Sequence, residues 1–160
     1  MRQVSRLARS EVALSWVNSV NGKALTQANS VNPAMMVLPR SGNPTEQAFY
    51  LWEIPSPPTG QQWALLVVAR DGRCAKRSSR GTVVELDKCD PSRRDEQFWI
   101  QYEAGRGYRL RPGNALSECV DIAGPRVAPP FAALVPCSTA PSQRWAIWLN
   151  PYSGSLVATR

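Results

Sequence analysis

The sequence predicts an all-β fold built from three copies of one four-strand unit. First, 14 prolines in 160 residues oppose a helical bundle, because a proline inside a helix costs about 3 kcal/mol. Second, short segments rich in β-branched and aromatic residues alternate with turn sequences. Third, tryptophans and cysteines both recur every 45 to 48 residues, and two independent markers rarely share a period by chance. Three such units would close a barrel and remove free strand edges.

The composition sets the class of protein before any motif is considered. Apolar residues make up 43% and charged residues 19% of the chain, which is the balance of a globular domain rather than a disordered segment. The absence of histidine excludes Ser-His-Asp and Cys-His catalysis and histidine metal sites. The carboxylates show no spacing that defines a catalytic acid pair. We therefore expect a protein that is not an enzyme and uses no cofactor or metal.

The expected strands follow the units in order. The units span about 13–57, 58–103 and 104–150, between a tail at 1–12 and a tail at 151–160. Turn sequences containing glycine, proline or serine separate the strands. The clearest strands are 63–68, 82–86 and 98–102 in the second unit, and 108–111, 119–122 and 132–135 in the third.

Three tryptophans mark the period of the units. Trp52, Trp99 and Trp145 lie 47 and 46 residues apart. The last two follow a glutamine in the pattern Gln-x-Trp, whereas the first follows Tyr50-Leu51. We expect these three side chains to form the repeated core of the units.

The four cysteines favour disulfides over a metal site. Cys74, Cys89, Cys119 and Cys137 are widely spaced, with no Cys-x-x-Cys motif. Four cysteines allow three pairings, and buried free thiols are the alternative. Sequential pairing would close loops of 14 and 17 intervening residues, each stabilising the fold by about 3 kcal/mol. Disulfides imply export, so we expect a secreted or periplasmic protein whose leader is absent from this chain.

Units of this length, each ending in Gln-x-Trp after a cysteine pair, resemble the ricin-type β-trefoil. The best-matched stretch is Cys-Val-Asp-Ile at 119–122, with Pro-Cys at 136–137 and Gln-Arg-Trp at 143–145. The resemblance covers about 13–150, and the first unit departs furthest because it has no cysteine. It implies an all-β β-trefoil with three Gln-x-Trp-like repeats and a short N-terminal tail.

The resemblance also implies where a sugar would bind. A ricin-type unit uses an acid two residues after its first cysteine and an aromatic platform before its second. In the third unit Asp121 holds the acid position, but Val135 holds the platform position. In the second unit Lys76 and Asp87 hold these positions. We expect Asp121 to be a weakened ligand-binding residue, with a turn-capping carboxylate as the alternative.

A trefoil that keeps its tryptophans and loses its sugar residues is similar to the binding subunits of cytolethal distending toxin. These A-type and C-type chains flank the nuclease of the toxin. The Trp-Glu-Ile-Pro stretch at 52–55 resembles this family, and the ending at 145–151, like the length of the chain, resembles the C-type chain. The resemblance implies a non-catalytic subunit that assembles with a nuclease subunit and a second trefoil subunit and attaches to a host-cell glycan or lipid. A free-standing ricin-type lectin or carbohydrate-binding module is the alternative.

The net charge of +7 favours acidic partners. Because a nuclease site is built for phosphate, Arg2, Arg6 and Arg9 could occupy a phosphate subsite of the nuclease partner. A basic disordered terminus is the alternative. The stretch 70–94 carries eight basic and four acidic residues, but no aromatic residues interleave with them. We therefore expect no direct nucleic-acid binding.

Three further tryptophans do not belong to the period of 46 to 47 residues. Tryptophan is enriched at interfaces, so we assign Trp16 and Trp148 to a partner interface and Trp63 to a ligand site. Burial in the core is the alternative for each of them.

Overall fold

The computed structural model describes residues 12–27, 33–41, 44–54, 57, 62–124 and 127–150. Each third of the chain has the same order of three strands, one short 3-10 turn and a last strand. The first third holds β1 (Leu14–Asn18), β2 (Ala24–Thr26), β3 (Met36–Leu38), η1 (Pro44–Gln47) and β4 (Phe49–Glu53). The second holds β5 (Trp63–Val68), β6 (Cys74–Arg77), β7 (Val84–Asp87), η2 (Arg94–Glu96) and β8 (Phe98–Glu103). The third holds β9 (Gly107–Pro112), β10 (Glu118–Asp121), β11 (Ala133–Pro136), η3 (Pro141–Gln143) and β12 (Trp145–Leu149).

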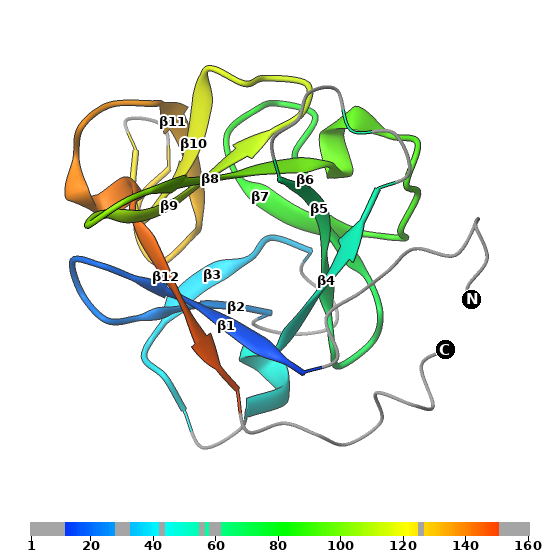
Figure 1. Ribbon diagram of the computed structural model, residues 1–160, viewed down its shortest axis with the longest axis horizontal. Coiled ribbons are helices and arrows are strands. Elements are labelled where there is room, and N and C mark those ends of the chain that lie inside the picture. The colour runs from blue at the N-terminus through cyan, green and yellow to red at the C-terminus, as the bar shows by residue number, and fades with distance from the viewer. Residues whose placement is uncertain are drawn as a thin grey trace.

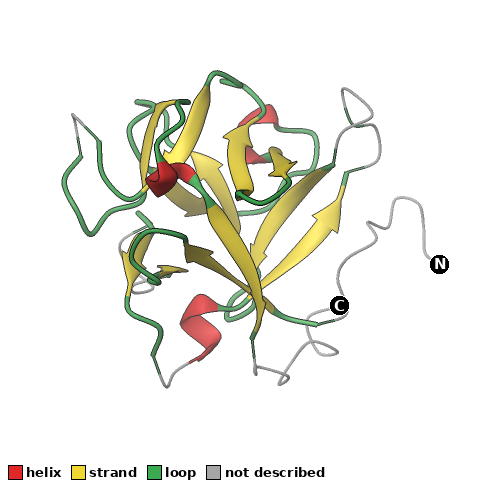
Figure 2. Ribbon diagram, turned by 60° about the vertical axis from the view of Figure 1, so that its left-hand side comes forward, coloured by secondary structure: helices red, strands yellow, loops and turns green. Residues whose placement is uncertain are grey.

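The first and last strands of each unit close into a barrel. The antiparallel pairs run β1–β12, β12–β9, β9–β8, β8–β5, β5–β4 and β4–β1, which returns to the starting strand. A closed ring leaves none of these strands at an edge. The middle strands form three hairpins, β2–β3, β6–β7 and β10–β11. The units surround a common centre in Figure 1, and Figure 2 shows the 3-10 turns in red.

Three backbone hydrogen bonds join the hairpins with threefold pseudosymmetry. The amide of Met35 donates to the carbonyl of Val84 at 2.9 Å, and the amide of Val84 donates to that of Ala132 at 3.0 Å. The amide of Ala132 completes the triangle at the carbonyl of Met35, also at 3.0 Å. Together with the barrel, this cap defines the architecture. The fold is a β-trefoil.

One core fills the barrel and the space under the cap. Its large side chains come from all three units, and burying each of them contributes about 1.5–3 kcal/mol. They include Trp16, Leu25, Met35, Phe49, Leu66, Phe98, Leu110 and Trp145. A smaller buried cluster around Trp63, Tyr50 and Leu65 lies on the other face of β4 and β5.

The structure corrects the expected core tryptophans. Phe49, Phe98 and Trp145 begin the last strands of the three units, and all three are 0% exposed. Trp145 thus lies in the core, where its Nε1 donates to the carbonyl of Val120 at 3.1 Å. Trp52 and Trp99 are partly buried and pack against the smaller cluster instead of the barrel core. They lie three and one residues beyond the core phenylalanines, and odd offsets along a strand place side chains on opposite faces.

The strand β9 approaches β12 closely because a glycine begins it. Gly107 has a φ of +103°, and a Cβ there would lie 2.8 Å from the carbonyl oxygen of Trp145. Because glycine has no Cβ, β9 can approach β12 this closely where the chain passes from the second unit into the third. None of the helices in the described residues is long and apolar enough to cross a membrane.

Candidate functional site

The two hairpins of the second and third units are closed by disulfides. Cys74 pairs with Cys89, and Cys119 pairs with Cys137. This is the sequential pairing among the three that the sequence allows. Each bridge joins the first strand of its hairpin to the segment that follows the second strand. The bridges therefore fix the bases of the two hairpins at which a ricin-type sugar site would lie.

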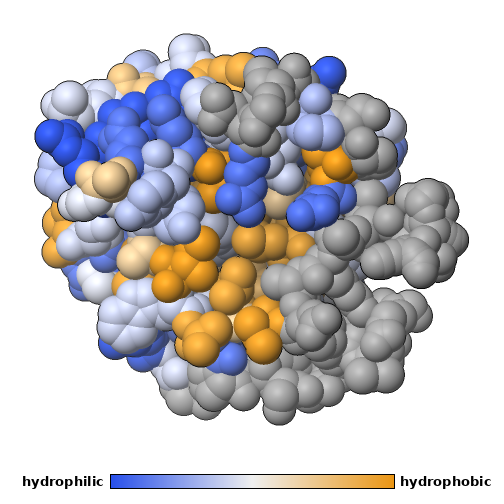
Figure 3. All heavy atoms as spheres, in the orientation of Figure 1, coloured by the Kyte–Doolittle hydropathy of each residue, from blue (hydrophilic) through white to orange (hydrophobic). Residues whose placement is uncertain are grey.

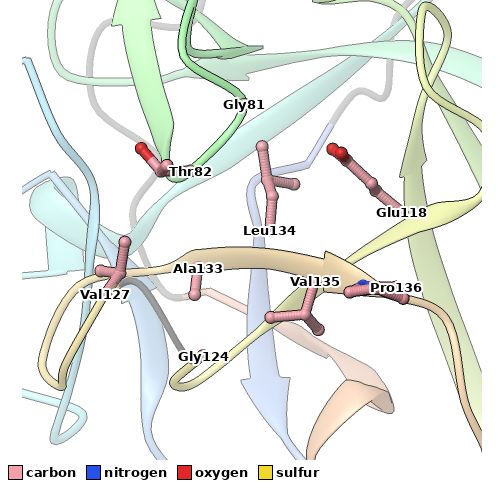
Figure 4. Close-up of a pocket in the computed structure, with 9 residues that line it drawn as sticks. All are labelled: Gly81, Thr82, Glu118, Gly124, Val127, Ala133, Leu134, Val135 and Pro136. Atoms are coloured by element: carbon pink, nitrogen blue, oxygen red, sulfur yellow. The ribbon is translucent and has the colours of Figure 1, made fainter.

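The third unit has a hollow of about 290 Å³ beside β11 (Figure 4). Ala133 and Val135 project from β11 toward the segment that carries Gly124, whereas Leu134 points to the other side. A Cβ at Gly124 would lie 2.5 Å from Cγ1 of Val135, so a side chain there would close the hollow. The lining is formed by Gly81, Thr82, Glu118, Gly124, Val127, Ala133, Leu134, Val135 and Pro136.

This hollow does not have the chemistry of a ricin-type sugar site. Sugar recognition needs an aromatic face and carboxylate or amide groups free to bind hydroxyls. Among the described residues, the lining contains no aromatic side chain. Its one carboxylate, Glu118, accepts two hydrogen bonds from Arg77, at 2.8 and 3.0 Å.

Asp121 lies under the hairpin rather than in the hollow. Its side chain is only 6% exposed. Its Oδ1 accepts the backbone amide of Ile122 at 2.6 Å, which matches the turn-capping alternative for this residue. Asp121 is not among the lining residues.

The other two units lack an acid at the corresponding position. The strand pairing places Lys76 of β6 and Thr26 of β2 where β10 has Asp121. The ammonium group of Lys76 lies 3.3 Å from Asp87 and 3.9 Å from Glu85. The hydroxyl of Thr26 donates to the carbonyl of Ala24 at 2.8 Å. In the described residues, no unit therefore presents the complete ricin-type set.

Two of the tryptophans assigned to surface roles are buried. Trp16 is 0% exposed and belongs to the barrel core, so its assignment to a partner interface is wrong. Trp63 is 4% exposed and stacks on Trp99, with ring centroids 6.4 Å apart. Arg111 covers Trp99 in turn, with Cζ 4.8 Å from the ring centroid. Trp63 has no free face for a ligand, because apolar strands and this stack enclose it.

Trp148 is exposed, unlike Trp16 and Trp63. It is 47% exposed near the end of β12, where it pairs across the ladder with Ser15. The guanidinium carbon of Arg40 lies 4.0 Å from the centroid of its ring, a cation–π contact that fixes the indole on the surface.

Further exposed apolar side chains lie at the same end of the β1–β12 ladder, on the face opposite to Trp148, because consecutive strand residues point to opposite faces. Leu149 is 77% exposed and pairs with Leu14, and Val12 is 54% exposed two residues before Leu14. We name Val12, Trp148 and Leu149 the ladder-end patch. Figure 3 shows apolar side chains gathered over β1 and β12 on this face. The sequence analysis selected Trp148 but missed Val12, Leu149 and Arg40, because only the strand pairing brings them together.

The basic stretch 70–94 is largely neutralised by neighbouring carboxylates. Five of its cations form ion pairs: Arg70 with Glu46, Arg73 with Asp71, Lys76 with Asp87, Arg77 with Glu118, and Arg93 with Asp95. A hydrogen bond from the backbone amide of Lys88, assisted by Lys76, lowers the pKa of Asp87.

The remaining sequence-based assignments concern the termini and metals. Arg2, Arg6 and Arg9 lie outside the described residues. Within the described residues, no group of three or more histidine, cysteine, aspartate or glutamate side chains is placed to hold a metal ion.

Comparison with known proteins supports the fold rather than a family. No protein-family model matches the sequence, and no curated protein is found as a relative. The chain is similar to a solved structure of the Haemophilus ducreyi cytolethal distending toxin, with a TM-score of 0.67 and 16% identity over 96% of this chain and 92% of that one. It is also similar to ThreeFoil, a designed threefold-symmetric protein, with a TM-score of 0.66 and 18% identity over 84% and 96%.

A third similar structure belongs to a larger protein. The GlcNAcα1-4Gal-releasing endo-β-galactosidase of Clostridium perfringens matches with a TM-score of 0.69 and 12% identity, over 88% of this chain and 33% of that one. At these identities the likeness shows the β-trefoil fold alone.

Proposed function

We propose that this chain is the non-catalytic binding subunit of an exported multi-subunit toxin of the cytolethal distending type. In this proposal it assembles with a nuclease subunit and a second trefoil subunit and contributes to attachment at the host-cell surface. Two disulfides support an oxidising location, since such bonds persist in secreted and periplasmic proteins.

The ladder-end patch is the observation that carries the proposal. Trp148 and Leu149 expose apolar surface at one end of the barrel, and Arg40 keeps the indole in place. Tryptophan and arginine are the side chains most enriched at the centres of protein interfaces. Large exposed apolar side chains gathered at one end of a barrel favour an interaction there.

Two further findings support a protein partner over a sugar. The hollow of the third unit has an apolar lining with its carboxylate already paired. The likeness to the cytolethal distending toxin structure covers 96% of this chain and 92% of that one.

The proposal is tested by assembly. The chain is expressed with the products of its neighbouring genes, and complexes are separated by size exclusion. We expect co-elution with the wild-type chain, and at least about tenfold weaker assembly for the double variant Trp148→Ala and Leu149→Ser, since interface anchors contribute 2 kcal/mol or more. Tyr102→Ala is the matched control, because Tyr102 is 59% exposed on a different hairpin. Elution of the wild-type chain as a lone monomer would contradict the proposal.

A carbohydrate-binding lectin is the second candidate, and Tyr102 favours it. This ring is exposed beside the β8–β9 turn and is supported by Tyr108, whose centroid lies 5.0 Å away. A fixed, exposed aromatic face can cover the apolar side of a sugar ring. Glycan-array binding that Tyr102→Ala abolishes, and that the Trp148 and Leu149 variant retains, would favour the lectin.

The basic terminus adds a prediction to the toxin proposal. Arg2, Arg6 and Arg9 would contact a phosphate subsite of the nuclease partner. Replacing all three with glutamine should relieve inhibition of the nuclease in the complex. Unchanged inhibition would remove this role and leave the proposed docking surface untouched.

A further inference from the structure

One position in each unit carries a buried side chain that fastens the preceding loop. Gln47, Glu96 and Gln143 end the three 3-10 turns, two residues before the core aromatic that begins the next strand. Their exposed fractions are 4%, 0% and 2%. The threefold pseudosymmetry therefore places a glutamate where the first and third units place a glutamine.

The two glutamines hold their loops in the same way. The amide nitrogen of Gln143 donates to the carbonyl of Pro136 at 3.1 Å, and its Oε1 accepts the amide of Ser138 at 2.8 Å. In the first unit, the amide nitrogen of Gln47 donates to the carbonyl of Pro39 at 2.9 Å, and its Oε1 accepts the amide of Ser41 at 3.3 Å. Each side chain needs one donor and one acceptor atom, which an amide supplies.

Glu96 forms only one of the two hydrogen bonds that each glutamine forms with its loop, the one in which its side chain accepts. Its Oε1 accepts the amide of Asp90 at 2.7 Å. Its Oε2 is buried and forms no hydrogen bond among the described residues. Lys88 precedes Asp90 by two residues, just as Pro39 and Pro136 precede the serines in the other units. An ionised carboxylate cannot donate to the Lys88 carbonyl, whereas a protonated one can.

We propose that Glu96 is a proton-dependent latch on the Asp87–Arg93 segment. In its protonated form Glu96 fastens this segment, as glutamine fastens the corresponding segments of the other units. When Glu96 loses its proton, the segment loosens. The segment contains Cys89 and lines an open hollow of about 310 Å³. The shape of this surface would therefore follow the acidity of the surroundings.

The electrostatic surroundings support this behaviour. Burial raises the pKa of Glu96 from 4.5 to about 7, and Asp95 and Asp87 act in the same direction. The hydrogen bond from Asp90 and the charge of Arg93 oppose the rise. Because the chain has no histidine, no side chain with an ordinary pKa titrates between pH 5 and 7.5.

The charged groups on the strands packed against η2 are engaged elsewhere. In β6, Lys76 pairs with Asp87 and Arg77 pairs with Glu118. In β9, Arg109 donates to the carbonyl of Ser138 at 2.8 Å and Arg111 donates to that of Leu116 at 3.1 Å. These contacts offer no counter-charge that would stabilise ionised Glu96.

The test is the pH dependence of the unfolding equilibrium. Urea unfolding of the whole chain is measured at pH 5.0 and 7.5 for the wild type and for Glu96→Gln. We expect the folding equilibrium constant of the wild type to fall roughly 50-fold between these pH values. Glu96→Gln should change less than about twofold, because its amide donates at both pH values.

Glu46→Gln is the matched control, because it removes a glutamate from the corresponding turn of the first unit, where Glu46 pairs with Arg70. The Glu46→Gln variant should lose as much stability between pH 5.0 and 7.5 as the wild type does. A Glu96→Gln chain that keeps this fall would overturn the latch. So would one that cannot fold at pH 5.0, since Gln47 and Gln143 show that glutamine suits this position.

Discussion

The buried guanidinium of Arg144 depends on a single carboxylate. Arg144 is 3% exposed, between η3 and β12, and forms an ion pair with Glu103 at the end of β8. The corresponding residues in the other units are the uncharged Ala48 and Gln97, so this pair is specific to the third unit. Removing one partner of a buried pair leaves an uncompensated charge.

At this scale we predict that Glu103→Gln lowers the free energy of unfolding by about 2 kcal/mol. This loss of stability is smaller than the loss expected for a fully buried ion pair, because the side chain of Glu103 is 32% exposed. Urea unfolding at pH 6 provides the measurement. Glu46→Gln breaks a more exposed pair with Arg70 and should cost less than about 1 kcal/mol. Equal losses in the two variants would contradict the account.

Among the elements, the three hairpins are held at their bases in different ways. Disulfides close β6–β7 and β10–β11. The β2–β3 hairpin has none, and Gln47 supplies hydrogen bonds there instead, including one to the hydroxyl of Thr26 at 3.0 Å. The first unit therefore keeps its shape without the cysteines that the resemblance led us to seek.

We predict that replacing Cys119 and Cys137 together with serine lowers the free energy of unfolding by about 3 kcal/mol, because the bridge closes a loop between residues 18 positions apart. The change in urea midpoint between the wild type and the variant measures this loss. Addition of a reductant should then have a smaller effect on the variant than on the wild type. A midpoint that does not move would show that the cap hydrogen bonds alone hold the hairpin.

For the whole molecule, the sequence predicted the architecture better than the site. The shared period of tryptophans and cysteines indicated three units, and the short strands and many prolines indicated an all-β class. The resemblance to ricin-type proteins then implied the β-trefoil. It could not set the face of each tryptophan, because a shift of one residue, as between Phe98 and Trp99, moves a side chain from the core to the outer cluster. The ladder-end patch could not be predicted from the sequence, since Val12 and Leu149 come to the same end of the barrel only through the pairing of Leu14 with Leu149.

Three carboxyl groups of the described residues with shifted pKa values contribute to the pH dependence of stability. Glu96 has a raised pKa, so the stability that it contributes is present below pH 4.5 and is lost as pH rises through about 7. Burial raises the pKa of Asp71, but hydrogen bonds from Arg73 and Gln27 outweigh it and leave a lowered value. The pKa of Asp87 is lowered by the Lys88 amide. The stability from these two aspartates is present above about pH 3.8 and is lost as pH falls.

We therefore predict that the urea midpoint of the wild-type chain is highest between about pH 4 and 5 and declines on both sides. A series of unfolding curves from pH 2 to 8 measures this profile. Glu96→Gln should lose only the decline on the neutral side. A midpoint that rises steadily to pH 7, as in most proteins with ordinary carboxylates, would contradict this profile.

We have proposed that the ladder-end patch docks a partner subunit. Hydrogen–deuterium exchange measured on the assembled complex tests this directly. Exchange is compared between the chain alone and the complex purified with its partner subunits. We expect protection from exchange in the complex to be concentrated at residues 12–18 and 145–150, with little change at the β8–β9 turn around Tyr102. Protection confined to that turn, or absent from both strands of the β1–β12 ladder, would contradict it.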